Sequence, residues 1–154
     1  MENTAIVMGR GLPISTRQSV EICNFIRNKT TEESRKLLEG VIAGKIAVPF
    51  KRYNRNVGHR KGKIASGRYP KNASESILKL VKSVEANAKH QGMSSSLIID
   101  EAIANKAVRA WHHGRIRRIK TKRTHIKLVV KEFKQAPTKE KKNESMKKKE
   151  VNKK

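Results

Sequence analysis

The sequence has little of several residue types on which common protein functions depend. Its 154 residues include a single cysteine, Cys23, which excludes an internal disulfide framework and a metal site built from several cysteines. Aromatic residues make up 4% of the chain and apolar residues 36%, enough for one modest core but not for two domains of ordinary size. No run of roughly 18 apolar residues occurs, and the first ten residues do not resemble a signal peptide. We therefore expect a cytoplasmic protein from a reducing compartment, with no membrane partner.

Acidic residues are scarce relative to basic ones. Lysine and arginine number 37 against 13 aspartates and glutamates, which gives a formal net charge of +24 at pH 7. A charge of this size indicates a polyanionic partner. Two long segments, residues 45–71 and 105–123, contain no acid at all. These two segments are the first candidates for the surface that contacts such a partner.

Three helices are predicted. Two lie between residues 12 and 44, because Ser15 and Thr30 each precede a glutamine or glutamate by three residues, the spacing of a capping box, and an apolar stripe follows each. The third and clearest helix covers about residues 72–89, where apolar residues recur at three- and four-residue steps. We expect this third helix to be the main core helix.

Two strands are predicted at residues 97–104 and 124–133, where apolar and polar residues alternate, and they would pair as an antiparallel hairpin. Ordinary hairpin loops have about two to five residues, far fewer than the connecting segment 105–123. That segment lacks the glycine, proline and serine content of a flexible loop. We expect the strands to continue outward as a projecting ribbon that turns near Gly114, with Trp111 close to the tip. The alternative is that Trp111 folds back onto the core.

Residues 45–71 are predicted to form an irregular loop, because prolines and glycines are scattered among the nine basic residues. Aromatic residues stand among these charges, which is unusual for a disordered linker. A solvated linker nevertheless stays open as an alternative. Residues 135–154 are rich in lysine and nearly free of apolar residues, the composition of a disordered polycation. The predicted organisation is an N-terminal extension at 1–11, one globular domain at 12–134 that includes the hairpin 105–123, and this tail.

Catalytic chemistry has little support in the sequence. Cys23 falls within an amphipathic helix and is predicted to be a buried apolar residue. His112 and His113 are adjacent, so their rings would point in different directions, and no known metal-ligand spacing surrounds them. No carboxylate lies between Glu101 and Glu132, which makes an RNA-modifying enzyme that uses either histidine the weakest hypothesis. We predict no enzymatic activity, no cofactor, no metal and no small-molecule substrate.

Nucleic-acid binding agrees better with the basic segments. Neutralising phosphates requires many lysines and arginines, and planar side chains among them can stack on exposed bases. Loops and ribbons follow the surface of folded RNA, whereas proteins that read duplex DNA in its major groove usually present a helix. A chromatin-type DNA-binding protein with a β-ribbon arm stays open as the alternative.

Six short strings occur in the order typical of one known family. They are Met8-Gly-Arg-Gly-Leu-Pro-Ile-Ser15, Val20-Glu-Ile-Cys23, Val48-Pro-Phe-Lys-Arg52, Val57-Gly-His-Arg-Lys-Gly62, Gly67-Arg-Tyr-Pro70 and Glu85-Ala-Asn-Ala88. Over about residues 8–132 the chain resembles the large-subunit ribosomal protein family numbered twenty-two, in its archaeal and eukaryotic form. The resemblance implies an α+β fold of three helices packed on a small three-stranded antiparallel sheet, with a long projecting β-hairpin. The third strand would lie within residues 45–71.

The resemblance also implies a function. A member of this family would be a structural constituent of the large ribosomal subunit that binds 23S-type rRNA, assists subunit assembly and lines the polypeptide exit tunnel with its hairpin. Its partners would be large-subunit rRNA, neighbouring ribosomal proteins and the nascent polypeptide. The hairpin tip departs from the family pattern, because Val108 replaces a proline and three residues, Trp111 to His113, stand in place of one.

The resemblance and the charge pattern together give two sets of expected site residues. The expected rRNA-binding residues are Lys51, Arg52, Arg55, His59, Arg60, Lys61, Lys63, Arg68 and Tyr69. The expected tunnel-hairpin residues are Lys106, Arg109, Trp111, His112, His113, Arg115, Arg117, Arg118 and Lys120.

Overall fold

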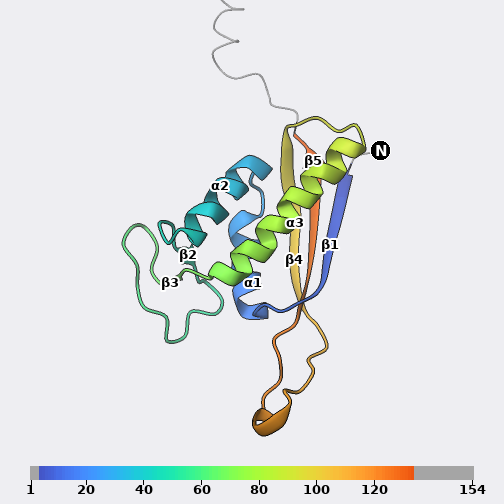
Figure 1. Cartoon of the computed structure of the whole chain (residues 1–154). Coiled ribbons are helices and arrows are strands. Elements are labelled where there is room, and N and C mark those ends of the chain that lie inside the picture. Colours follow the sequence, from blue (N-terminus) through green and yellow to red (C-terminus); the bar gives the residue numbers. More distant parts are fainter. Residues whose placement is uncertain (1–3, 134–154) are drawn as a thin grey trace, which may run out of the picture.

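A computed structural model describes residues 4–133 and shows an α+β fold with three helices and a small antiparallel sheet (Figure 1). The predicted lysine-rich tail lies outside the described residues. The elements, in chain order, are β1 (Thr4–Leu12), α1 (Thr16–Ile26), α2 (Thr31–Ile42), β2 (Val48–Pro49), β3 (Gly67–Arg68), α3 (Lys71–His90), β4 (Leu97–Lys106), the 3-10 turn η1 (Gly114–Ile116) and β5 (Thr124–Glu132).

The main sheet has three antiparallel strands in the order β1-β5-β4. The predicted hairpin is confirmed, because β4 pairs with β5 from Leu97 opposite Glu132 to Lys106 opposite Thr124. The predicted location of the third strand was wrong. That strand is β1, which pairs with β5, whereas β2 and β3 within residues 45–71 form a separate two-stranded sheet. Residues 4–11, in the segment predicted as an N-terminal extension, are therefore part of the main sheet.

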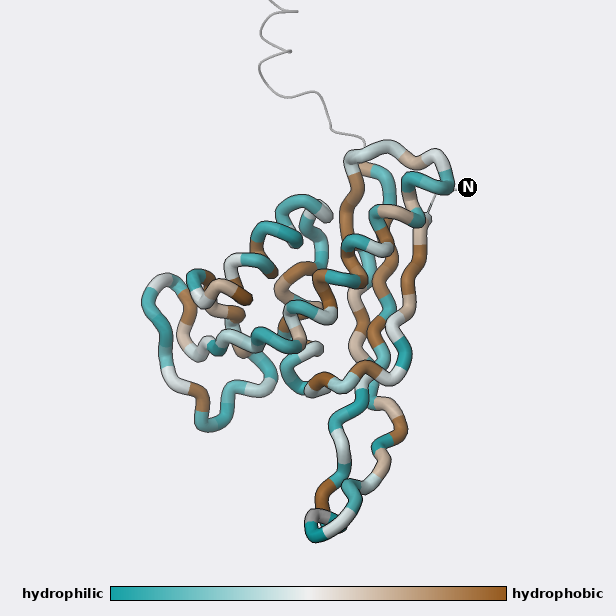
Figure 2. The backbone as a smooth tube through the Cα atoms, in the orientation of Figure 1, coloured by the Kyte–Doolittle hydropathy of each residue, from teal (hydrophilic) through white to brown (hydrophobic). Residues whose placement is uncertain are grey.

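The core lies between one face of this sheet and the helices. α1 and α3 pack on the strands, and α2 packs on α3. Ile22, Ile77 and Leu128 are completely buried at this junction. Figure 2 shows apolar stretches along the strands of the main sheet, while the two projecting basic segments are mainly hydrophilic. Within residues 4–133 no helix is both long enough and apolar enough to cross a membrane.

The starts of α1 and α2 differ from each other. Thr30 caps α2 as predicted, because its hydroxyl accepts the Glu33 N–H at 3.2 Å. Ser15 is the residue before α1, but its side chain makes no capping bond, so the capping box predicted there was wrong. The start of α1 is instead tied to β5 by Thr124, whose hydroxyl donates to the Ile14 carbonyl at 2.9 Å. This contact joins α1 to the place where the hairpin leaves the sheet.

Candidate nucleic-acid interface

The first basic segment forms a loop over residues 50–66 with a defined backbone. It projects beside α1 and α2 (Figure 1). The Phe50 N–H donates to the Ser66 carbonyl and the Arg60 N–H to the Ala65 carbonyl, both at 2.9 Å. Gly62, at the far bend, has a φ of 106°, a conformation that favours glycine. These bonds give the loop a shape of its own, unlike the solvated linker considered from sequence.

A buried glutamate anchors the start of this loop. Glu21, on α1, is 1% exposed, and its carboxylate accepts three backbone N–H bonds, from Lys51 at 3.2 Å, Arg52 at 2.8 Å and Tyr53 at 2.7 Å. A buried carboxylate is tolerated when hydrogen bonds satisfy its oxygens, and hydrogen bonds to charged groups are stronger than neutral ones. Glu21 therefore fixes the backbone where the cationic side chains begin.

Aromatic rings lie beside several of the loop's cations. The guanidinium carbon of Arg52 is 5.5 Å from the centroid of the Tyr53 ring, and that of Arg60 is 5.3 Å from the Tyr69 ring. These are cation–π distances. Tyr69 is half-buried, and the other residues predicted to bind rRNA, in the loop and on β3, are exposed: Lys51, Arg52, Arg55, His59, Arg60, Lys61, Lys63 and Arg68. The loop thus presents its charges outward over partly exposed rings.

The second basic segment, residues 105–123, begins in the last two residues of β4, and its residues 107–123, which project from the end of the main sheet, are called the arm below (Figure 1). Three backbone bonds join its two sides: Ala107 N–H to the Arg123 carbonyl at 3.1 Å, Thr121 N–H to Ala110 at 2.8 Å and His112 N–H to Ile119 at 2.9 Å. No described side chain from residue 108 to residue 123 is buried. The arm therefore has no core of its own.

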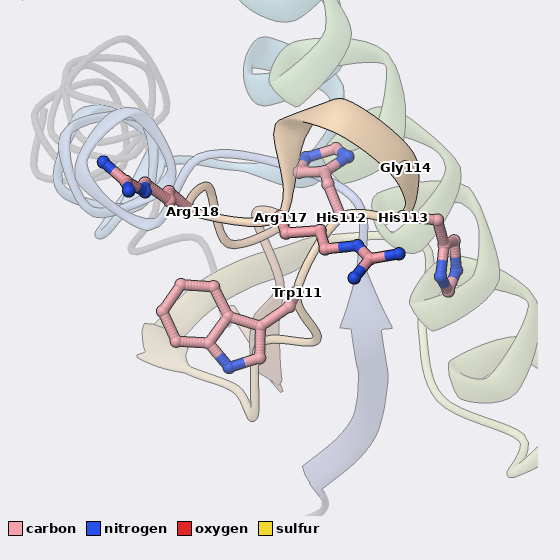
Figure 3. A pocket seen from close by; sticks show the side chains of 6 residues that line it. All are labelled: Trp111, His112, His113, Gly114, Arg117 and Arg118. Atoms are coloured by element: carbon pink, nitrogen blue, oxygen red, sulfur yellow. The ribbon is translucent and has the colours of Figure 1, made fainter.

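Six residues line a hollow of about 660 Å³ at the tip of the arm (Figure 3). They are Trp111, His112, His113, Gly114, Arg117 and Arg118. Trp111 is 54% exposed, so the expectation that it lies at the tip is correct and the fold-back alternative is wrong. The ammonium nitrogen of Lys120 lies 4.3 Å from the centroid of the Trp111 ring. A half-exposed indole among cations is suited to stacking against a planar group.

The three residues considered for catalysis, Cys23, His112 and His113, do not come together in one site. Cys23 is 1% exposed, which confirms its predicted burial, and burial raises the pKa of its thiol to about 12 although nearby Arg27 opposes the shift. The rings of His112 and His113 point apart in Figure 3. Within residues 4–133 no group of three or more histidine, cysteine or acidic side chains is placed to hold a metal ion.

The structure brings some of the predicted residues together and leaves others apart. Lys106 and Arg109, from the base of the arm, line one cleft with Tyr53 from the start of the loop, whereas the arm tip lies away from the loop (Figure 1). The expected sites omitted Arg17, which lines the same cleft, and Glu21, which is buried and holds the start of the loop. The sequence feature that could have indicated Glu21 is its position as an acid within the most apolar part of a predicted helix.

Comparison with known proteins gives one consistent result. The model of the family described as ribosomal protein L22p/L17e matches residues 7–131. Among the similar curated proteins is one from Methanoculleus marisnigri, 42% identical over 139 residues, which covers 85% of this chain and 91% of that protein. One from Archaeoglobus fulgidus is 47% identical over 105 residues, covering 66% of this chain and 68% of its own, and one from Nanoarchaeum equitans is 40% identical over 142 residues, covering 87% and 82%. Each of the three carries the name large ribosomal subunit protein uL22.

Proposed function

Because the chain belongs to the ribosomal protein L22p/L17e family, we propose that it is a structural constituent of the large subunit of the cytoplasmic ribosome. It binds 23S-type rRNA through the loop and the arm, and it assists subunit assembly. The arm lines part of the polypeptide exit tunnel, where it meets the nascent chain. Members of this family are structural ribosomal components, and the protein is not an enzyme.

The observation that carries this proposal is the separation of the charges. In the described part of the chain every ion pair lies on α2, α3 or the strands β4 and β5, and the pairs are Arg35–Glu39, Arg35–Glu85, Lys127–Glu101 and Lys131–Asp100. None involves a cation of the loop or the arm. The one acid that reaches the loop, Glu21, is buried and bonded to backbone. The charges of both segments are therefore not neutralised by acids of the described chain, which leaves them available to phosphates.

The mechanism follows from electrostatics and stacking. Lysines and arginines neutralise RNA phosphates and release their counterions, which lets RNA segments approach one another. Rings such as Tyr69 and Trp111 offer faces on which unstacked bases can lie. The arm buries no described side chain beyond Ala107, so it becomes fully ordered only when it binds the surrounding RNA.

A competition experiment tests RNA binding. Labelled large-subunit rRNA is bound to the full chain, and unlabelled rRNA or duplex DNA of equal phosphate content competes at the same salt concentration, because affinities depend steeply on salt. We expect the RNA to compete far better. A clear preference for duplex DNA would overturn the proposal and restore the chromatin alternative.

The role of the arm has its own test. We predict that replacing Arg115, Arg117 and Arg118 by alanine weakens protection of the arm in the RNA complex without changing the folding of the domain, because these side chains are exposed and the arm contributes little to the core. Hydrogen exchange with and without rRNA measures the protection, and circular dichroism measures the fold. If these changes unfolded the free domain, the claim that the arm projects from the domain and contributes little to its core would be contradicted.

A further inference from the structure

A polar cleft of about 510 Å³ lies where the arm joins the domain, and we call it the arm-base cleft. Its walls come from the start of α1, the start of the loop, the end of β4 and both sides of the arm. Five cations and one aromatic ring line it: Arg17, Lys106, Arg109, Lys122, Arg123 and Tyr53. Its volume is within the range of about 300–1,000 Å³ typical of ligand sites.

The cations of the arm-base cleft lack anionic partners. Within residues 4–133 none of the five forms an ion pair. Arg123 uses one guanidinium nitrogen to donate to the Gly11 carbonyl at 2.9 Å, and Arg17 lies over the Tyr53 ring at 5.8 Å. The Nε atom of Arg109 is buried and has no hydrogen-bond partner. A buried donor without a partner is costly, so this atom in particular calls for an acceptor that enters the cleft.

The backbone of the cleft adds to this preference for an anion. Ser15 and Thr16, which also line the cleft, stand at the start of α1, where the Ser15 side chain makes no capping bond and the first turn holds no acid. Unoccupied N–H groups at a helix start carry partial positive charge. The helix start therefore reinforces the field of the five side chains.

We propose that the arm-base cleft binds a phosphodiester group of RNA and that this contact sets the direction of the arm relative to the domain. The inference rests on the proposed function. Guanidinium groups bind phosphate oxygens through paired N–H donors, and Tyr53 provides an apolar wall for the adjoining sugar or base. The cleft is continuous with the loop and the arm, the two segments assigned to RNA, and this favours a phosphate over the carboxylates of an acidic protein.

The position of the cleft explains how one contact could orient the arm. Lys106 ends β4, Arg109 follows it on one side of the arm, Lys122 and Arg123 come from the other side, and Arg17 comes from the domain. A phosphate held among them joins all three parts. Beyond Ala107, which is 7% exposed, the described arm residues bury no apolar side chain that could do the same.

The first test compares two variants of the full chain that each lose two charges. Arg17→Gln with Lys122→Gln removes exposed cations of the cleft, and Lys36→Gln with Lys79→Gln removes exposed cations of α2 and α3. We expect the cleft variant to bind large-subunit rRNA about tenfold or more weakly and to reduce the slope of log affinity against log salt by about one to two. The control should change affinity less than about threefold, because its charges lie away from the bound phosphate and are screened.

The second test reports the direction of the arm. Because Cys23 is buried, a His113→Cys variant provides one reactive thiol at the arm tip, to which an iron chelate that cleaves nearby RNA is attached. With the intact cleft, and in the Lys36/Lys79 control, cleavage should fall at a few adjacent nucleotides. With Arg17 and Lys122 replaced, it should spread over many.

The outcomes separate the inference from the proposed function. Equal affinity, equal salt slope and equal cleavage pattern in the two double variants would overturn the inference, while rRNA binding by both would leave the proposed function standing. Binding of a polyglutamate peptide to the same variants is measured as well. If the Arg17/Lys122 variant lost peptide binding but kept the RNA affinity of the unaltered chain, the inference would also be overturned, and the cleft would be assigned to an acidic protein segment. Failure of the unaltered chain to prefer rRNA would instead refute the proposed function.

Discussion

Replacing Glu21 tests whether one buried carboxylate gives the basic loop its shape. One of its oxygens accepts bonds of 2.8 and 2.7 Å from Arg52 and Tyr53, and the other accepts one of 3.2 Å from Lys51. A hydrogen bond to a charged group contributes about 1.5–3 kcal/mol. In Glu21→Gln the amide oxygen keeps the two short bonds in neutral form while its NH₂ group faces the Lys51 N–H, so we expect a loss of about 1–2 kcal/mol in the free energy of unfolding. Glu21→Ala loses all three bonds and should cost about 3–4 kcal/mol, less than their sum because water reaches the exposed residues.

Urea denaturation measures both losses, and RNA binding shows whether they matter for function. Glu75→Gln is the matched control, because Glu75 is exposed and its replacement raises the net charge equally, from 37 − 13 = +24 to 37 − 12 = +25. If net charge alone governed affinity, both variants would bind rRNA slightly more tightly. We expect Glu21→Gln to bind several-fold more weakly than Glu75→Gln at the same salt, since its loop is no longer held. If Glu21→Gln and Glu75→Gln had equal free energies of unfolding, or equal RNA affinities, the claim that Glu21 holds the loop would be refuted.

Three further predictions concern other parts of the molecule. Because the pKa of the Cys23 thiol is raised to about 12 from an ordinary value of 9.0, the stability that the uncharged thiol contributes is complete below pH 9 and is lost as pH rises toward 12. Iodoacetamide should accordingly alkylate this thiol at pH 8 only when urea unfolds the chain, and rapid labelling of the folded protein would contradict its burial. Thr124→Val should lower the free energy of unfolding by about 1–3 kcal/mol in urea denaturation, because the buried hydroxyl bonds to Ile14 and Thr16; an unchanged value would show that these bonds contribute nothing net. Trp111→Ala should change stability by less than about 0.5 kcal/mol because the ring is 54% exposed, while the emission of Trp111, the only tryptophan of the chain, should shift on RNA binding; an unchanged emission would exclude contact at the tip.

The helices and the central hairpin could be predicted because their signals are local. The steps of three and four residues in α3 and the alternation in β4 and β5 arise from side chains close in sequence, and the structure confirms these elements. β1 gave no such signal, because Gly9 and Gly11 interrupt its alternation. Its place is set by pairing with β5, at the other end of the described chain. That pairing depends on tertiary structure, which a local pattern does not contain.

The family and the charged segments could also be predicted, but the geometry between the segments could not. The six strings identified the L22p/L17e family, which the comparisons confirm. The acid-free composition marked the loop and the arm separately. That Arg17 and Tyr53 would meet Lys106 in one cleft depends on how α1, the loop and the arm converge in space. The role of Glu21 was hidden for the same reason, since its bonds reach backbone groups about 30 residues later.

The central claim is that this protein is built into the large ribosomal subunit through RNA, and sedimentation tests it most directly. A tagged copy of the full chain, expressed in the cells from which the sequence comes, is followed through a sucrose gradient at high salt, with large-subunit rRNA measured in the same fractions. Peripheral polycations dissociate as salt weakens their phosphate contacts, whereas a protein embedded among RNA segments stays bound. We predict that the tagged protein sediments with the large subunit. Its release into the free fraction, with subunits intact, would contradict the account.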